Sequence, residues 1–479
     1  MAEIRSEQAA KVPRRILGTL LASLSGGVVP RVGAPYIAIG RSEEIEALAS
    51  ALDRVADGEG TTKFIIGRYG SGKSFLIQLA RGYALERGFV TADADLSPER
   101  KLAGGGGLAT YRELMKNAAS KSSPDGGALP IILDRWFAKL GGEMEDEGFD
   151  PNAEAFGAEL SRRITKKLRE LEDGVGGYDF ASVLRAYYEG WRDDDDAKRS
   201  ACLRWLRGEY GTRTEARAAT GIRNLSIVSD ENWYDFLKLF TAFVRLAGYS
   251  GLCLYIDECV NLYKIPNRIS RENNYEKILS MFNDTMQGRA PGLMIVFGGT
   301  PQFLEDGRRG LYSYEALRSR LADGRFGGGE LRSLMQPVIR LRRLSDSELY
   351  ALVIRLTALH GEYHRWTPRI TEENMRDFLT QSVAREGASS MITPREIIRD
   401  YVTLLDLLYT NAGVGFAEIV GRVERTTAGP DPDGLPDGLE EGGLADPRQA
   451  AHAGETGGTG AADSSSAPRS TVTLDDIEF

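Results

Sequence analysis

One eight-residue segment limits the possible folds of this chain more than any other. Residues 67–74 read Gly-Arg-Tyr-Gly-Ser-Gly-Lys-Ser, which fits the pattern Gly-x-x-x-x-Gly-Lys-Ser/Thr of phosphate-binding loops. The apolar residues 64–66 come directly before it, and residues 74–87 have the apolar spacing of a helix. A buried strand, a glycine-rich loop and a helix in this order predict an α/β fold built on a parallel sheet.

The residue types in this segment suit the phosphates of ATP. Its glycines allow successive backbone N–H groups to face the phosphates, and the following helix adds the positive end of its dipole. Lys73 would reach the β and γ phosphates, and the hydroxyl of Ser74 would bind Mg²⁺. We therefore expect ATP and Mg²⁺ as ligands. The loop residues expected to hold the nucleotide are Gly67, Arg68, Tyr69, Gly70, Ser71, Gly72, Lys73 and Ser74.

A second apolar run, residues 252–256, ends in the two carboxylates Asp257 and Glu258. The carboxyl ends of parallel strands meet at one edge of a sheet, so we expect this pair beside the phosphate loop. Asp257 would then help to hold Mg²⁺, and Glu258 would polarise the water that attacks the γ-phosphate. The alternative is an exposed strand end with two solvated acids.

Thr300 is a candidate for orienting the attacking water. It follows the expected strand 293–297 through two glycines, and ligands gather at the carboxyl ends of parallel strands. A hydroxyl there would have the role called sensor 1, in which it orients the water that attacks the γ-phosphate. The alternative is a turn residue in front of Pro301.

Two arginines are candidates for stabilising the transferred phosphate. Arg320, within residues 317–321, would reach the γ-phosphate of a neighbouring subunit, with Arg318 as the second choice. Arg395 follows Pro394 at the start of a late helix and would bring a helical lid onto the nucleotide. The alternative for either arginine is an ordinary solvated surface position.

The spacing of the expected strands indicates a long insertion. The stretch between the second strand, 89–92, and the third, 252–256, is too long for one crossover and contains helical patterns, the clearest at 233–246. The predicted organisation is a helical lead-in at 1–34, an α/β core at 35–341 with the helical insertion at about 100–246, a helical lid at 342–425, a disordered acidic linker at 426–470 and a tail peptide at 471–479.

Composition changes after residue 425. Residues 426–470 are rich in Gly, Pro, Asp, Ala and Ser and poor in large apolar residues, so they bury too little surface to offset the entropy of ordering. Eleven acidic and two basic residues lie between 426 and 479, and this excess equals the formal net charge of −9 of the whole chain. The remainder is close to neutral, which excludes a strongly basic nucleic-acid binder and an acidic mimic.

The sequence favours the cytoplasm. It has no apolar run long enough to cross a membrane, and the charged residues 1–15 do not have the pattern of an export signal. Its three cysteines are irregularly spaced, which fits a reducing compartment without a disulfide framework.

The motifs resemble those of AAA+ ATPases in kind and in order, from the phosphate loop to the Ser-Arg-Leu segment at 319–321 and the Pro-Arg pair at 394–395. The resemblance implies a three-layer α/β core followed by a helical lid. Residues 39–45, Ile-Gly-Arg-Ser-Glu-Glu-Ile, are similar to the Gly-Arg-x-x-Glu box of Orc1/Cdc6-like initiator ATPases. That box contacts the adenine side of the nucleotide, which implies nucleotide contacts for Gly40 and Arg41.

A closer resemblance is to the BrxD-like ATP-binding proteins of BREX systems. It rests on residues 35–41, 64–75, 93–98 and 254–258 and on the long helical insertion, and it adds Phe75 to the expected nucleotide contacts. Such proteins are encoded in bacterial anti-phage defence islands, often beside a large Lhr-like superfamily II helicase. The resemblance therefore implies a defence role and a helicase partner.

The last nine residues, 471–479, resemble the acidic, apolar-tipped end of bacterial single-stranded DNA-binding proteins. In those proteins the terminal Phe docks in a pocket of a partner, beside basic residues. The resemblance implies a docking role for Asp475, Asp476, Ile477 and Phe479. The alternative is a solubilising tail.

These patterns predict a homo-oligomeric ATPase that hydrolyses ATP to remodel or load a protein–DNA complex in phage defence. DNA contacts would not be sequence-specific, because initiator relatives carry a winged-helix domain after the lid and the ordered chain is expected to end near residue 425. Two alternatives stay open. One is a nucleotide-gated scaffold with slow hydrolysis, and the other is a signalling ATPase of STAND or initiator type, which would need an effector or DNA-binding domain.

Overall fold

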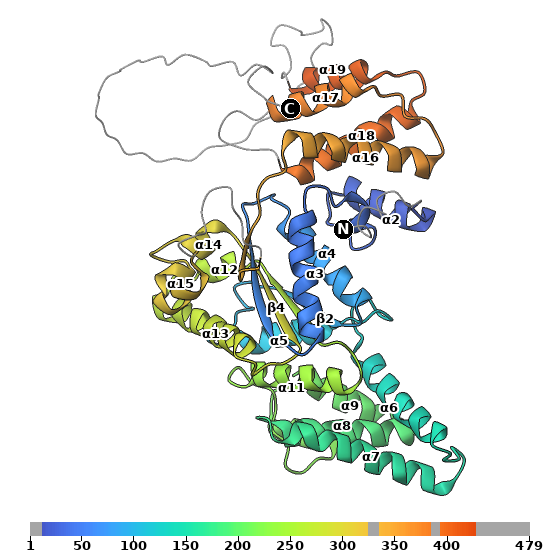
Figure 1. Cartoon of the computed structure of the whole chain (residues 1–479), viewed down its shortest axis with the longest axis vertical. Coiled ribbons are helices and arrows are strands. Elements are labelled where there is room, and N and C mark those ends of the chain that lie inside the picture. Colours follow the sequence, from blue (N-terminus) through green and yellow to red (C-terminus); the bar gives the residue numbers. More distant parts are fainter. Residues whose placement is uncertain (1–11, 324–334, 385–392, 428–479) are drawn as a thin grey trace, which may run out of the picture.

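The computed structural model describes residues 12–323, 335–384 and 393–427 (Figure 1). Within them, five strands form one sheet in the order β2-β3-β4-β1-β5, and every neighbouring pair is parallel. The strands are β1 Thr61–Ile66, β2 Val90–Asp95, β3 Leu252–Asp257, β4 Leu293–Gly299 and β5 Val338–Arg340. The predicted α/β class with a parallel sheet is confirmed, and each predicted strand overlaps an observed one.

The strand order places β4 between the two strands that lead to the predicted site residues. β1 leads into the phosphate loop, and β3 ends at Asp257. β4 pairs with both, so that Ile66 lies opposite Gly299 and Ile256 lies opposite Phe297. Residues that follow these three strands therefore lie side by side at the carboxyl edge of the sheet.

Helices cover both faces of the sheet, because successive side chains of a strand point to opposite faces. Ile65 and Tyr255 belong to the core of one face, whereas Phe64 and Ile256 belong to the core of the other. The first face is covered by α3 Ser42–Ala56 and α4 Lys73–Glu86. The second is covered by α12 Val260–Tyr263, α13 Arg268–Met286, α14 Pro301–Glu305, the 3-10 helix η2 Leu311–Ser313 and α15 Glu315–Leu321.

The helices between β2 and β3 form an insertion; α5 lies beside the sheet, and the insertion extends away from the sheet beyond it (Figure 1). Aromatic side chains dominate its core, where Trp136 meets Phe243 edge to face at 5.2 Å between ring centroids. The predicted apolar stripe of residues 233–246 is buried there, and this core continues into one face of the sheet. The helices are α5 Gly107–Lys116, α6 Leu129–Asp146, α7 Glu154–Glu172, α8 Gly177–Arg192, α9 Asp196–Leu206, α10 Arg213–Thr220 and α11 Trp233–Leu246.

The N-terminal helix packs on the C-terminal helices. Leu20 and Leu24 of this helix share a core with Leu356 and Leu405, and that core is separate from the two cores of the sheet. We call the whole assembly the lead-in–lid unit, and Figure 1 shows it at the end of the molecule opposite the insertion. Its members are α2 Arg14–Ser25, the 3-10 helix η1 Ala34–Ile37, α16 Asp346–His364, α17 Glu372–Ala384, α18 Pro394–Thr410 and α19 Phe416–Thr427.

The predictions for the C-terminal tail fall almost entirely outside the described residues. Helix α19 ends at Thr427, so only the first two residues of the predicted linker 426–470 are described, and none of the tail peptide 471–479. Among the helices that the structure describes, none is long and apolar enough to cross a membrane.

Candidate nucleotide-binding site

The phosphate loop connects the end of β1 to the start of α4. Gly67 donates its N–H to the carbonyl oxygen of Gly299 at 3.1 Å, which anchors the loop beside β4. Gly70 and Gly72 have φ angles of 76° and 89°, in the left-handed region that favours glycine. A Cβ atom on Gly70 would lie 2.4 Å from the side chain of Thr393, so the loop also closely approaches the lead-in–lid unit.

The start of α4 offers backbone N–H groups to an anion. Its N-cap residue is Gly72, which has no side chain to accept hydrogen bonds from the first turn. Beside it, Oγ of Ser71 is buried and lacks a hydrogen-bond partner among the described residues. Open N–H groups and an unpartnered buried hydroxyl at one helix start are features of a phosphate site.

Lys73 lies inside the loop. Its ammonium group donates to the carbonyl oxygens of Gly67 and Arg68, both at 3.0 Å. Burial lowers the pKa of Lys73, and the nearby carboxylates of Asp257 and Glu258 counter part of that shift. The ammonium group of Lys73 therefore lies between the loop carbonyl groups and the carboxylates at the end of β3.

The start of α4 and the end of β3 come together at this edge of the sheet. The hydroxyl of Ser74 donates to the carboxylate of Asp257 at 2.8 Å, and the backbone N–H of Glu258 donates to the same carboxylate at 2.8 Å. A hydroxyl and a carboxylate are hard oxygen ligands, which fit Mg²⁺. Glu258 has a φ of 56°, an uncommon backbone conformation for a residue other than glycine, and it lines the same pocket as Lys73.

Asp95 is a third carboxylate at this edge, and the sequence reasoning missed it. It lies opposite Asp257 where β2 pairs with β3. Burial raises the pKa of Asp95, and the charges of Asp257 and Glu258 raise it further. The apolar run 89–92 gave no sign that the strand continues through Asp95, because that extension depends on pairing with β3.

A pocket joins the phosphate loop to the lead-in–lid unit. At one end it is lined by Ser71, Gly72, Lys73, Ser74 and Glu258. At the other end apolar side chains line it, from both the lead-in and the lid: Leu24, Val28, Val29, Pro30, Ile37, Ile39, Leu344, Leu352 and Ile398. A polar end and an apolar end in one pocket suit a nucleotide, whose phosphates are charged and whose base is flat and largely apolar.

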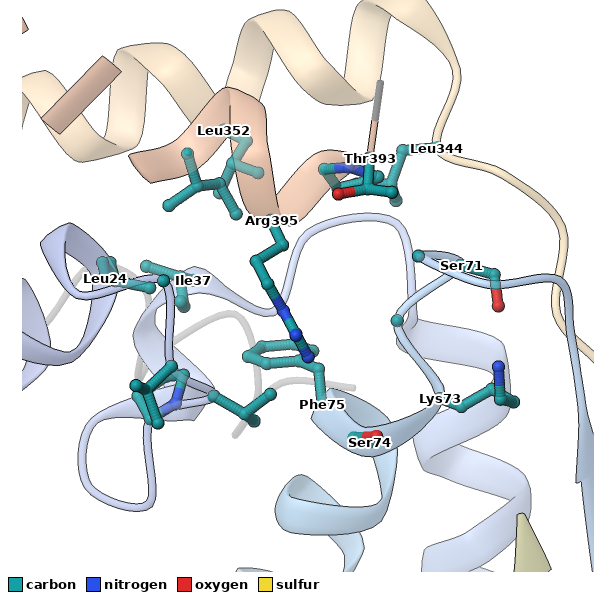
Figure 2. A pocket seen from close by; sticks show the side chains of 18 of the residues that line it. Leu24, Ile37, Ser71, Lys73, Ser74, Phe75, Leu344, Leu352, Thr393 and Arg395 are labelled. Carbon is teal, nitrogen blue, oxygen red and sulfur yellow. The ribbon is translucent and has the colours of Figure 1, made fainter. Parts of the chain in front are cut away.

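Arg395 enters this pocket from the lid. It lies in the first turn of α18, where Thr393 and Glu396 form a capping box that fixes the helix start. Figure 2 shows its side chain extending toward the ring of Phe75, above the start of α4. The structure therefore brings Arg395 and Phe75 together with Lys73 and Ser74.

The other predicted nucleotide contacts lie around the same loop. Arg41 and Tyr69 line the pocket, and 83% of Tyr69 is exposed. Arg68 is exposed and is not among the lining residues; its carbonyl oxygen, as noted, accepts from Lys73. Gly40 has a φ of 70°, and a Cβ atom there would lie 2.6 Å from the carboxyl group of Glu348 in the lid.

Thr300 and Arg320 lie outside the pocket lining. Thr300 follows β4 directly, and its hydroxyl accepts a hydrogen bond from the N–H of Phe303 at 3.3 Å, so it caps α14. Arg320 lies exposed on α15 and donates to the side-chain oxygen of Asn283 at 3.1 Å. A role for Arg320 at the γ-phosphate of a neighbouring subunit stays a prediction.

A second cluster of polar side chains lies within the lid. His360, His364 and Asp406 approach one another closely enough to suggest a metal site. However, the indole N–H of Trp366 donates to Nδ1 of His360 at 3.0 Å, so the ring proton of neutral His360 is on Nε2, facing Asp406 at 3.0 Å. Nε2 then has no lone pair for a metal, and we interpret the cluster as structural.

The model of one protein family matches residues 12–424, nearly the whole described chain, and its description is BREX system ATP-binding protein BrxC/D. The chain belongs to this family. Membership in BrxC/D makes it an ATP-binding protein of BREX phage defence, which confirms the predicted resemblance at the level of BREX ATP-binding proteins. The match spans the insertion and the lead-in–lid unit, so both belong to the BrxC/D architecture. No curated protein matches the chain.

Proposed function

We propose that this BrxC/D protein is an AAA+ ATPase that hydrolyses ATP and uses the cycle to remodel or load a protein–DNA complex during phage defence. The observation that carries the hydrolytic step is the meeting of Ser74, Asp257 and Glu258 beside the phosphate loop. Hydrolysis needs a base for the attacking water and oxygen ligands for Mg²⁺, and these three side chains supply both.

The polar end of the pocket would bind the phosphates. Backbone N–H groups of the loop and of the first turn of α4 would face them, and Lys73 would exchange its two carbonyl partners for phosphate oxygens. Ser74 and Asp257 would hold Mg²⁺, which supplies positive charge to the phosphates when bound. The apolar end would hold the base between the lead-in and the lid.

Glu258 would act as the base toward the attacking water. Thr300 lies at the end of β4, between the loop and the carboxylates, where its hydroxyl would orient the same water. Arg395 would bring positive charge from the lid as ATP is cleaved. The strand between the loop and the carboxylates, and an arginine at the start of a lid helix, support the AAA+ type.

In the homo-oligomer that we propose, the exposed Arg320 would reach the γ-phosphate bound by a neighbouring subunit. The test is the ATPase rate per subunit over a range of protein concentrations, with and without single- and double-stranded DNA. We expect the rate to rise with concentration in the wild type and to stay low in Arg320→Ala. The exposed, ion-paired Arg289 provides the control variant Arg289→Ala. Equal, concentration-independent rates in all three proteins would exclude an active site that is completed by Arg320 of a neighbouring subunit.

Glu258→Gln tests hydrolysis itself. Loss of the base should leave ATP binding intact and slow turnover by about 10²-fold or more. Glu86→Gln, at an exposed pair with Lys121, is the matched control. Normal turnover in Glu258→Gln would exclude Glu258 as the base.

The second candidate function is a nucleotide-gated scaffold. It is favoured by the position of the pocket, since bound ATP would join the α/β core to a unit with a separate core. If binding alone acts, cells with Glu258→Gln would resist phage and cells with Lys73→Ala would not. If both variants lose resistance, the hydrolysis cycle is required.

We further propose an Lhr-like helicase as the partner, with residues 471–479 as the docking peptide. The test is retention of an Lhr-like superfamily II helicase on the immobilised full chain and on a chain that lacks those nine residues. Loss of retention in the shortened chain alone supports docking by Asp475, Asp476, Ile477 and Phe479. Equal retention would leave the tail as a solubilising segment.

A further inference from the structure

The lead-in–lid unit is joined to the α/β core through two crossovers in the described chain. One is the short link from η1 to α3, which contains Gly40 and Arg41. The other leads from β5 to α16 and contains Arg342. These two links are the covalent connections between the unit and the phosphate-loop side of the molecule within the described residues.

The side chain of Arg41 touches both links and the loop. Its Nη2 atom donates to the carbonyl oxygen of Ser71 at 2.8 Å and to that of Arg342 at 2.8 Å. Nη1 lies 3.7 Å from the carboxylate of Glu44. Only 3% of Arg41 is exposed, and a buried guanidinium is costly unless its N–H groups are satisfied. The geometry therefore assigns this arginine to specific carbonyl groups instead of to solvent.

The bond to Ser71 bears on the orientation of the phosphate loop. In a trans peptide the C=O and the following N–H point in opposite directions. By holding the carbonyl of Ser71, Arg41 turns the N–H of Gly72 away from itself. The N–H groups of this loop are the ones that would contact phosphate, so Arg41 helps to fix their direction.

The two links also touch each other. The carboxylate of Glu348 accepts from the guanidinium of Arg342 at 2.6 Å and from the N–H of Ser345 at 2.8 Å. The same carboxylate lies against Gly40, where the backbone has a φ of 70° and has no room for a Cβ atom. The first link is thus packed against the start of the lid.

We propose that Arg41 is a positioning residue that couples the phosphate loop to the lead-in–lid unit. A change in the Ser71 peptide on phosphate binding passes through the shared guanidinium to Arg342 and so to the start of α16. The proposal rests on nucleotide binding at this loop. It gives Arg41 a different role from the adenine contact that its motif implies.

Hydrogen–deuterium exchange without nucleotide separates the two roles. We expect Arg41→Lys and Arg41→Ala to raise exchange in residues 68–74 and in residues 341–348, because both segments lose a bond to the guanidinium. Arg54→Ala, on the helix α3 that follows Arg41 and in a partly exposed pair with Glu59, should leave both segments unchanged. Melting curves of all variants establish that each is folded, and Arg41→Lys keeps the charge if Arg41→Ala does not fold.

ATP affinity, measured with a fluorescent ATP analogue, completes the test. We expect a loss of about tenfold in Arg41→Lys, since hydrogen bonds from a charged group are lost. Gly40→Ala should raise exchange in residues 341–348 from the other side of the same contact. Lower affinity with unchanged exchange would overturn the proposal in favour of a direct nucleotide contact. Faster exchange in residues 68–74 without faster exchange in residues 341–348 would overturn the proposal that Arg41 couples the loop to the lead-in–lid unit. Failure of the wild type to bind ATP would instead refute the proposed function. The exchange results, obtained without nucleotide, would still show whether Arg41 holds both segments.

Discussion

The hydroxyl of Ser74 donates a hydrogen bond of 2.8 Å to the carboxylate of Asp257, which lies 183 residues further along the chain. The first residue belongs to the start of α4 and the second to the end of β3, and β4 lies between β1 and β3 in the sheet. The bond therefore joins the two halves of the candidate site.

Asp257→Asn should remove the Mg²⁺ dependence of ATP binding. The amide keeps the size of the carboxylate but loses the charge that attracts the ion. In the wild type we expect ATP to bind more tightly with Mg²⁺ than with EDTA, and in the variant we expect little difference. Asp53→Asn, at an exposed pair with Arg87, serves as the control. An undiminished Mg²⁺ effect in Asp257→Asn would place the ion elsewhere.

Arg395→Ala should weaken ATP binding about tenfold, because a charge-assisted contact from the lid is lost. Arg399 lies one turn later on α18, where it is exposed and contacts Asp400. Titration of a fluorescent ATP analogue against both alanine variants compares two arginines of one helix. If Arg395→Ala and Arg399→Ala bind the ATP analogue with equal affinity, Arg395 is an ordinary surface arginine of the first turn.

Leu20→Ala should loosen the lid although the change is near the N-terminus. Leu20 is fully buried in the core shared by α2, α16 and α18, so its truncation should cost about 2–5 kcal/mol in the stability of that core. Hydrogen exchange should rise in α16 and α18. Leu52→Ala makes a comparable cavity in the core of the sheet and should leave those helices protected. Unchanged exchange of α16 and α18 in Leu20→Ala would mean that the lead-in does not stabilise the lid.

The lid should lose stability as the pH falls below about 6.5. Burial lowers the pKa of His360 from its ordinary 6.5, so the unfolded chain takes up a proton that folded His360 does not. The free energy of unfolding is therefore highest above pH 6.5 and declines as the pH drops through the window below it. Chemical denaturation between pH 7.5 and 5.5 measures this. His360→Gln should flatten the decline, whereas His364→Gln should retain most of it; an unchanged slope in His360→Gln would assign the effect to other groups.

The strands and the phosphate loop could be predicted because each depends on local sequence. Central parallel strands are short apolar runs with turn residues after them, and residues 64–66 and 252–256 have that form. The loop pattern is contiguous. The meeting of Ser74 and Asp257 then follows from the rule that ligand sites gather at one edge of a parallel sheet.

Helix α13 could not be predicted, because its buried face is partly polar. Arg271 and Asn274 occupy core positions and hydrogen-bond to backbone groups: Arg271 donates to the carbonyl of Ile265 at 2.9 Å, and Asn274 accepts from the distant N–H of Leu102 at 2.8 Å. Such residues remove the apolar periodicity that marks a helix. Asp95 and the packing of α2 on the lid were missed for a related reason, since both depend on partners far along the chain.

The shared core of α2 and the lid has a consequence for the order in which the chain can fold during synthesis. During synthesis α2 leaves the ribosome long before its partners, because α2 ends at Ser25 and α16 begins only at Asp346. At roughly 5–20 residues per second, translation of the intervening segment takes on the order of tens of seconds. During that time the apolar face of α2 is without its final contacts, and the α/β core and its insertion can fold first. The pocket is thus closed by segments that lie far apart in the sequence, α2 on one side and α16 and α18 on the other, and the nascent chain has no complete nucleotide site until α18 has emerged.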